Sequence, residues 1–367
     1  MKHILKKHKF YLLSILIFIL TFVIFKFSYK FPNIIEYYYS ERIFIVISKI
    51  QSSLFNIFPF SVFEILIISL IFASFIYVFI QIYKCFKNKK YKQELLRLSL
   101  RSITTLSIVY ILFIHFWGFN YNRQSLSEKL KLDIRKSDII ELENLSEYLF
   151  QKVLILRKNI KEDSLGIMSL NNNFSNISKM AIQGYDNIKL TQISNSKYYS
   201  KPKRILFSGI MSNLGVSGIY SPFTGEVNIN SKLPEVQIPF TLCHEMAHQR
   251  GYAKEDEANF ISYIVCKNHE NIEFKYSGYL MAFLYTFSKL RKYNPEKYKE
   301  ISIGLSPGIR RDLSAINKFW SKYQNNIIEK SANYINDAYL KVNMQKDGIH
   351  SYGRIVDLLL AEYRTTI

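Results

Sequence analysis

Two histidines and a glutamate occur together in the segment PFTLCHEMAHQRG, residues 239–251. His244 and His248 are four residues apart, so on a helix their imidazole rings project from one face, about one turn apart. Two neutral imidazoles at that spacing can both bind one Zn²⁺ ion. Glu245 follows the first histidine and would act as a general base on water acidified by the metal. The motif predicts zinc-dependent hydrolysis; the alternative is an amphipathic helix with two histidines on its polar face.

The residues around this motif carry the signals of a helix and of a short β segment before it. Pro239 is tolerated in a first turn, and Gly251 suits the position after the last turn, where φ is often positive. Residues 204–230 contain β-branched residues separated by glycine, serine and proline, which indicates short strands and turns. Residues 225–230, GEVNIN, are expected to offer their backbone to an extended peptide, or else to form a plain core strand.

A catalytic zinc site needs a third protein ligand and one open position. Metzincin proteases place a third histidine six residues after the second, but Lys254 occupies that position here. The next segment, EDEANF at residues 255–260, resembles the E-x-x-A-[DN] element of gluzincin metallopeptidases. This resemblance implies that Glu255 is the third ligand and that Asn259 hydrogen-bonds a zinc-bound histidine and orients its ring. Glu257 is the alternative ligand.

The acidic run at residues 255–257 also has a structural interpretation. Carboxylates in the first turn of a helix interact favourably with the helix dipole without binding any metal. The run also follows the second histidine more closely than in most gluzincins. The third ligand is therefore less specifically predicted than the two histidines.

Polar residues near the C-terminus are candidates for stabilising charge on a substrate. His350, Tyr352 and Arg354 lie in the segment GIHSYGR, and their side chains are suited to stabilising an oxyanion across the zinc. The alternative is an ordinary surface turn. Tyr252 and Tyr276 are weaker candidates.

Three apolar segments in the first third of the chain predict membrane-spanning helices, at about residues 10–27, 60–82 and 103–119. Each has the length of about 17–25 residues that a helix needs to cross the hydrocarbon core. Lysines before the first segment are also typical of a signal peptide, but the apolar run is too long and no small-residue cleavage site follows. The third segment ends in aromatic residues, as expected at a membrane–water interface.

Basic residues predict the orientation of these spans. The N-terminal tail and residues 84–101 are rich in lysine and arginine, and the positive-inside rule places both in the cytoplasm. Three crossings then put everything after residue 119 outside the cytoplasm. We expect a multi-pass membrane region at residues 1–119 and an extracytoplasmic domain at residues 120–367.

Helical periodicity dominates the second region. Helices are predicted at residues 137–159, 258–267, 277–293, 309–330 and 331–343, with Ser137 as the N-cap of the first. The expected fold class is mainly α: three N-terminal transmembrane helices followed by a predominantly helical, zincin-like domain with a small β segment. A chain of 367 residues is long enough for both parts.

Composition excludes some functions. The formal charge of +20 suggests nucleic acid, but the basic residues are scattered or flank apolar segments, and no nucleic-acid-binding motif is present. No nucleic-acid partner is expected. Three cysteines do not make a disulfide framework. Cys243 and Cys266 flank the motif region and are expected to be free buried thiols, or to pair if their helices meet.

Several longer segments resemble an uncharacterised family of bacterial multi-pass membrane proteins, a domain of unknown function. They are GIYSPFTGEVNIN at residues 218–230, LPEVQIPFTLCHEMAHQRGYAKEDEANF at 233–260 and YSGYL at 276–280, with YLKVN and SYGRIVDLLL near the C-terminus. The resemblance implies a zinc-peptidase-like site and supplies no substrate.

These observations lead to one main hypothesis and two alternatives. The main hypothesis is a membrane-anchored zinc metallopeptidase that hydrolyses peptide bonds of extracytoplasmic proteins or peptides, with Zn²⁺ as cofactor and the lipid bilayer as a partner. The first alternative is a non-catalytic zinc-binding membrane protein with a structural or sensory role. The second is a basic surface protein that binds anionic wall polymers or lipid head groups.

Overall fold

The computed structural model describes residues 2–88, 91–188, 199–324, 327–343 and 354–365. Within these ranges, three helices are long and apolar enough to cross a membrane: α1 (Lys2–Ser28), α4 (Val62–Asn88) and α5 (Tyr91–Phe116). Their apolar parts are Lys9–Ser28, Val62–Lys84 and Glu94–Phe116. The three predicted spans are confirmed. The third starts earlier than predicted and ends at Phe116, because the chain then tightens into a 3₁₀ helix, η2 (Gly118–Asn122).

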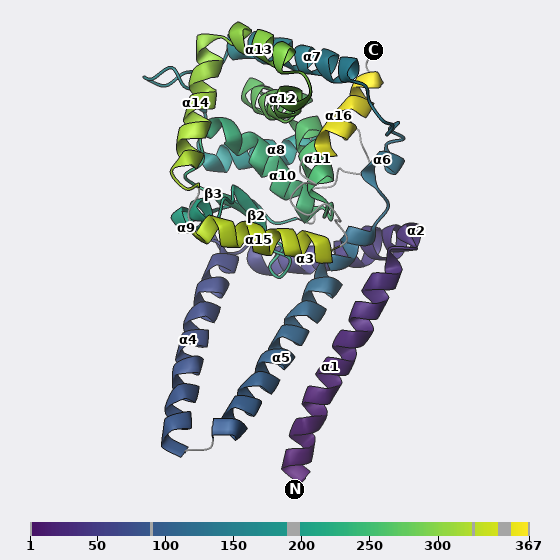
Figure 1. Cartoon of the computed structure of the whole chain (residues 1–367), viewed down its shortest axis with the longest axis vertical. Coiled ribbons are helices and arrows are strands. Elements are labelled where there is room, and N and C mark those ends of the chain that lie inside the picture. The colour runs from purple at the N-terminus through teal and green to yellow at the C-terminus, as the bar shows by residue number, and fades with distance from the viewer. Residues whose placement is uncertain (1, 89–90, 189–198, 325–326, 344–353, 366–367) are drawn as a thin grey trace.

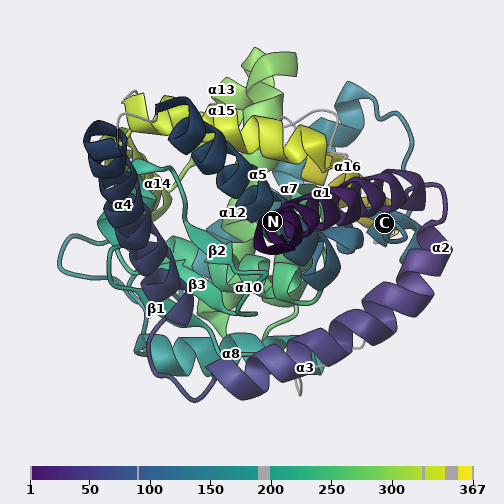
Figure 2. The same cartoon turned by 90° about the horizontal axis from the view of Figure 1, so that it is seen from below.

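The spans stand below a helical domain, and α5 packs against both α1 and α4 (Figure 1). The N-terminus and the adjoining ends of α4 and α5 lie at the end of the spans furthest from the domain. Between the first two spans the chain forms α2 (Pro32–Ile34), a π-helix η1 (Ile35–Ile43) and α3 (Phe44–Phe55). These three run across the tops of the spans, at the base of the domain (Figures 1 and 2).

Helices make up most of the domain, and the mainly α fold class is confirmed. The helices before the HEMAH motif are α6 (Leu126–Lys129), α7 (Ile139–Arg157), α8 (Phe174–Asn187), α9 (Ser208–Asn213) and the 3₁₀ turn η3 (Glu235–Gln237). The motif lies on α10 (Ile238–Gln249), and the later helices are α11 (Glu255–Lys267), α12 (Ile272–Tyr293), α13 (Pro295–Gly304), α14 (Pro307–Ser321), α15 (Ile327–Val342) and α16 (Ile355–Arg364).

Several helix limits differ from the predictions: α11, α12, α14 and α15 begin two to five residues earlier than expected. The N-cap of α7 is Asp138 rather than Ser137, because the Asp138 carboxylate accepts a hydrogen bond from the backbone N–H of Glu141 at 2.8 Å. The helix predicted at residues 309–330 ends at Ser321.

A small sheet supplies the β segment, in the order β1 (Lys203–Ile205), β3 (Val227–Asn230), β2 (Gly218–Tyr220). β3 is parallel to β1 and antiparallel to β2, so it is paired on both sides. The prediction that residues 225–230 form an edge strand for peptide binding is therefore wrong. Among the described residues, β2 is the strand beside the motif helix whose outer edge pairs with no other strand.

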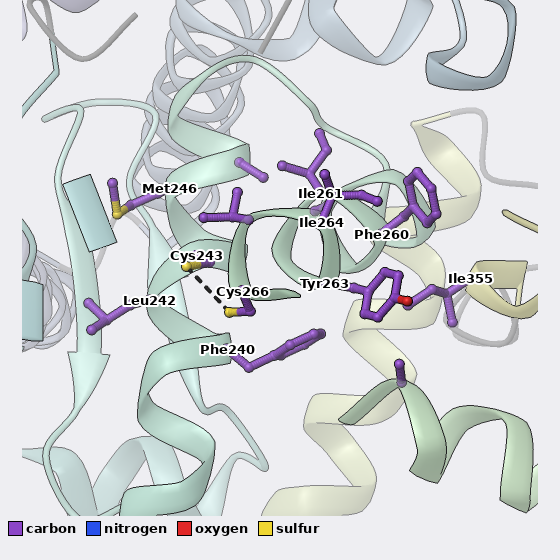
Figure 3. Close-up of a cluster of buried hydrophobic side chains, with 14 of the residues drawn as sticks. Phe240, Leu242, Cys243, Met246, Phe260, Ile261, Tyr263, Ile264, Cys266 and Ile355 are labelled. Atoms are coloured by element: carbon purple, nitrogen blue, oxygen red, sulfur yellow. Dashed lines mark hydrogen bonds between the residues drawn. The ribbon is translucent and has the colours of Figure 1, made fainter. Parts of the chain in front are cut away.

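The core behind the motif is formed where α10, α11 and α12 pack together. Figure 3 shows Phe240, Leu242 and Met246 of α10 in the same buried cluster as Phe260 and other residues of α11. The helices approach closely enough that the Sγ atoms of Cys243 and Cys266 are 3.7 Å apart, and both thiols are free and buried, as expected. This packing fixes the positions of α10 and the start of α11 relative to each other.

Candidate metal centre

The motif helix α10 begins and ends as its sequence predicts. Pro239 lies in its first turn, and Gly251 takes a φ of +81° just after it. The Gly251 N–H donates to the carbonyl of His248 at 2.9 Å, and the Tyr252 N–H donates to that of Ala247 at 3.1 Å. These bonds turn the chain sharply after α10, and α11 begins only a few residues later.

Three side chains converge at this turn: His244 and His248 of α10 and Glu255, the first residue of α11. The two Nε2 atoms are 3.1 Å apart. Oε2 of Glu255 is 3.2 Å from His244 Nε2 and 3.5 Å from His248 Nε2. Three ligands in a tetrahedral zinc site, with bonds of about 2.0–2.1 Å, are spaced by about 3.3 Å. The group has the size and donor set to hold a metal ion.

The ring of His248 is oriented by the backbone. Its Nδ1 atom is 2.8 Å from the carbonyl oxygen of Tyr252, which can only accept, so Nδ1 carries the proton. In the neutral ring, Nε2 then keeps its lone pair facing His244 and Glu255. The same side chains retain some exposure, 13% for His244, 9% for His248 and 15% for Glu255, so the centre can be reached from solvent.

Glu245 is buried beside the group and is held from two sides. The backbone N–H of Tyr220 in β2 donates to its carboxylate. Gly218, two residues earlier in β2, lies so close that a Cβ atom there would be 2.6 Å from Glu245 Cγ. Burial raises the pKa of Glu245 despite the opposing effect of the two histidines. Strand β2 therefore determines where this carboxylate points.

The charged side chains of the group shift one another's pKa values. Burial acts against ionisation of Glu255, but His248 and His244 keep its pKa well below the usual range. Burial alone would lower the pKa of His248, yet Glu255 and Glu245 raise it to about 9. The carboxylates of Glu255 and Glu245 therefore favour a positive charge at His248.

The alternative ligand, Glu257, points elsewhere. Its Oε1 atom accepts hydrogen bonds from the Leu126 N–H at 3.0 Å and from Lys254 Nζ at 3.3 Å. It thereby caps the start of α6 rather than joining the histidines. Of the two acidic residues considered, Glu255 is the one whose carboxylate meets both imidazoles.

The predicted role of Asn259 stays a prediction. Asn259 is buried, but the structure records no hydrogen bond between it and either histidine. Its Nδ2 atom and His244 Nδ1 are both buried without a partner among the described residues.

The remaining sequence candidates are dispersed. His350 and Tyr352 lie outside the described residues, so their predicted roles stay predictions. Arg354 is exposed at the start of α16, where its charge acts on Asp256, the neighbour of Glu255. Two weaker candidates have structural contacts instead: the Tyr276 hydroxyl donates to Asp312 at 2.6 Å, and the Tyr252 ring lies 4.2 Å from the Arg123 guanidinium.

Other aromatic residues near the centre were not predicted from the sequence. Tyr285 of α12 and Tyr339 of α15 lie within electrostatic range of Glu255: burial, and then that charge, raise the pKa of both hydroxyls. The indole N–H of Trp117, which follows α5, donates to the carbonyl of His248 at 3.1 Å. Nothing in the local sequence marks these residues, because each comes from an element remote from the motif.

Comparison with known proteins gives the family but no function. No curated protein and no solved structure matches the chain. A family model described as "Protein of unknown function (DUF3810)" matches residues 39–360, which include the spans α4 and α5, the sheet and the three residues His244, His248 and Glu255. Since the match covers most of its length, the chain belongs to the DUF3810 family.

Proposed function

We propose that the protein is a membrane-anchored zinc metallopeptidase that hydrolyses peptide bonds of extracytoplasmic proteins or peptides. The observation that carries the proposal is the meeting of His244, His248 and Glu255 within bonding distance of a common point, with a buried fourth side chain, Glu245, beside them. A purely structural metal site would not need that additional carboxylate.

Zinc suits this donor set better than Ca²⁺ or Mg²⁺ does. Two imidazoles and one carboxylate are ligands that Zn²⁺ accepts in catalytic sites, whereas Ca²⁺ and Mg²⁺ prefer oxygen donors throughout. Among the described residues, no fourth histidine, cysteine, aspartate or glutamate joins the group. Three protein ligands leave a position open, as catalytic sites require. When bound, Zn²⁺ would polarise the scissile carbonyl and make water a stronger acid.

Glu245 would act as the general base. It would take a proton from the water whose oxygen attacks the carbonyl carbon, and return one to the amide nitrogen as the C–N bond breaks. The products are a carboxylate and an amine. The raised pKa of Glu245 brings its basicity closer to neutral pH, and Gly218 and the Tyr220 N–H prevent it from turning away.

Strand β2 would bind the substrate backbone. Its outer edge, which no described strand covers, runs beside α10 and ends at Tyr220, whose N–H holds Glu245. An extended peptide added to this edge would pass the metal group with its carbonyl groups in a fixed register. This assigns to β2 the role that the sequence suggested for residues 225–230.

The distribution of basic residues supports a position for the domain on the extracytoplasmic side of the membrane. The N-terminus and the Lys-rich ends of α4 and α5 lie at the opposite end of the spans from the domain (Figure 1). Basic residues favour the cytoplasmic side, so the domain with the metal group would be extracytoplasmic.

Glu245→Gln provides the test. The amide keeps the shape of the side chain but cannot take a proton, so we expect zinc to remain bound at one equivalent while peptidase activity falls by about 10²–10⁴-fold. Metal analysis and peptide cleavage measure the two quantities separately. The matched control is Glu270→Gln, an exposed residue after α11, which should change neither. Activity retained in Glu245→Gln would contradict the role of Glu245, and bound zinc without turnover in the wild type would favour a structural or sensory site.

A further inference from the structure

The metal group lies next to the end of a membrane span. The apolar part of α5 ends at Phe116, and the next residue, Trp117, touches the motif helix. The Trp117 ring meets the His248 ring edge-on, with centroids 6.0 Å apart, and the Tyr220 ring of β2 at 5.7 Å. Tryptophan at the end of a span marks the membrane–water interface. One aromatic side chain therefore separates a metal-binding histidine from the bilayer boundary.

The domain is also attached to the tops of the other two spans, and these contacts fix the height of the metal group above the ends of the spans. At α1, Asn122 Nδ2 donates to the Phe25 carbonyl at 2.8 Å. At α4, the buried Glu226, the residue before β3, accepts from the backbone N–H groups of Val62 at 3.1 Å and Phe63 at 2.7 Å. In return, Glu64 of α4 accepts from the N–H groups of two residues before α9. Hydrogen bonds at the tops of α1 and α4, together with that of Trp117 directly after α5, hold the domain at this level.

The base of the domain is apolar where it surrounds the spans. The last residue of η1 and helix α3 together expose a stripe at helical spacing, made of Ile43, Val46, Ile50 and Leu54. Exposed apolar residues also occur before and on α9 (Leu206, Phe207 and Ile210) and on α15 (Tyr334, Ile335 and Val342). Figure 1 shows α3, α9 and α15 at one level, along the tops of the spans. Helices of this kind lie in the plane of the interface, with their apolar face among the lipid head groups.

The motif helix α10 and the edge strand β2 both lie on the side of the domain that faces the spans. Seen from below, α10, β2 and β3 lie within the frame formed by α3, α4, α5 and α15 (Figure 2). Contacts confirm that this proximity is not an effect of the view: Trp117 touches α10 and β2, and Tyr339 of α15 packs on Phe113 of α5, 6.0 Å between ring centroids. A chain that reaches the metal group would therefore pass along the bilayer surface.

We propose that the substrate is a juxtamembrane segment of a membrane-anchored polypeptide, which binds extended along β2 and is cleaved within a few residues of the bilayer. The inference rests on the proposed peptidase function. A segment that leaves the membrane in extended form would enter at the level of Trp117 and meet β2 and the metal group at once. A folded soluble protein would have to unfold a segment and press it against the membrane-facing side.

The test uses the full-length protein in lipid vesicles with substrates of matched sequence. A randomised eight-residue peptide library is attached to a polyleucine transmembrane helix through a polar linker of about five or about thirty residues, the longer reaching up to about 100 Å from the bilayer. The same library is also supplied as free peptides. Mass spectrometry of the products locates each cleaved bond, and Glu245→Gln is the inactive control.

We expect the short-linker library to be cleaved at least about tenfold faster than the long-linker library, since both have the same surface concentration and differ only in geometry. Equal rates for the two linkers, or faster cleavage of free peptides, would overturn the juxtamembrane substrate and leave the peptidase function standing. Cleavage of none of the three libraries by the zinc-loaded protein would instead contradict the peptidase function itself.

Discussion

Gly218 of β2 and Glu245 of α10 are packed so closely that a Cβ atom on Gly218 would lie 2.6 Å from Glu245 Cγ and 2.7 Å from its Oε1 atom. Gly218→Ala should therefore push the carboxylate out of position. We expect zinc to remain bound and peptide cleavage to fall by about 100-fold or more, as for a misplaced catalytic group. Metal analysis and cleavage rates measure both effects. Gly209→Ala is the matched control, because its Cβ would meet only the flexible end of Lys232 at 3.3 Å. Unchanged activity in Gly218→Ala would show that β2 does not position Glu245.

The third ligand is tested by two neighbouring substitutions. Glu255→Gln removes the carboxylate that meets both histidines. The loss of one of three ligands should abolish stoichiometric zinc binding. Glu257→Gln removes a carboxylate that caps α6, so zinc should stay at one equivalent while stability falls by about 1 kcal/mol. Zinc content after dialysis distinguishes the two variants. The reverse pattern would make Glu257 the ligand.

Two tyrosines are expected to stabilise the reacting carbonyl. Tyr285→Phe and Tyr339→Phe remove hydroxyl groups within electrostatic range of Glu255. Because each hydroxyl is expected to donate to the oxyanion, its loss should lower kcat by about 10²–10³-fold with zinc retained. Tyr279→Phe on α12, which lies away from the metal group, is the control. Wild-type kcat in both variants would remove these tyrosines from the reaction.

The effect of zinc on stability should grow as pH rises. In the metal-free protein the folded pKa of His248 is about 9, above the unfolded value of about 6.5. The stability from its protonated form is fully present below pH 6.5 and is lost as the pH rises through 9. Zinc takes the place of that proton. The difference in Tm between zinc-loaded and chelated protein should therefore widen from pH 6 to pH 9. A constant difference would show that zinc does not compete with a proton on His248.

A buried ion pair far from the metal group should matter for folding alone. Asp312 is fully buried and accepts from Arg157 Nε at 2.6 Å, the Tyr276 hydroxyl at 2.6 Å and the Met168 N–H at 2.7 Å. Asp312→Asn removes the buried carboxylate beside Arg157 and leaves it only the exposed Glu162 at 3.0 Å, which should cost about 3 kcal/mol of unfolding free energy. Asp357→Asn, in an exposed pair with Lys289, should cost at most about 1 kcal/mol. Similar losses in the two variants would argue against this assignment.

Features with a local cause were predictable from the sequence. The spans follow from the length of their apolar runs, and the motif helix from Pro239, Gly251 and the spacing of the two histidines. These depend on neighbours within one or two helical turns, which the sequence displays directly. The resemblance to gluzincins also led to Glu255, but could not exclude Glu257, since both begin the same helix.

Tertiary structure alone decided which groups meet. Whether Glu255 or Glu257 faces the histidines depends on the angle between α10 and α11, which the packing of Cys243 against Cys266 and their neighbours sets. Of the described strands that contact α10, β2 is the one with a free edge, because β1 pairs with the other side of β3 from more than twenty residues upstream. Trp117, Gly218 and Tyr339 reach the centre from three distant parts of the chain. Such contacts are paid for by the whole folded core and leave no periodic trace in the sequence, so only the fold shows that His244, His248 and Glu255 meet next to the end of a candidate membrane span.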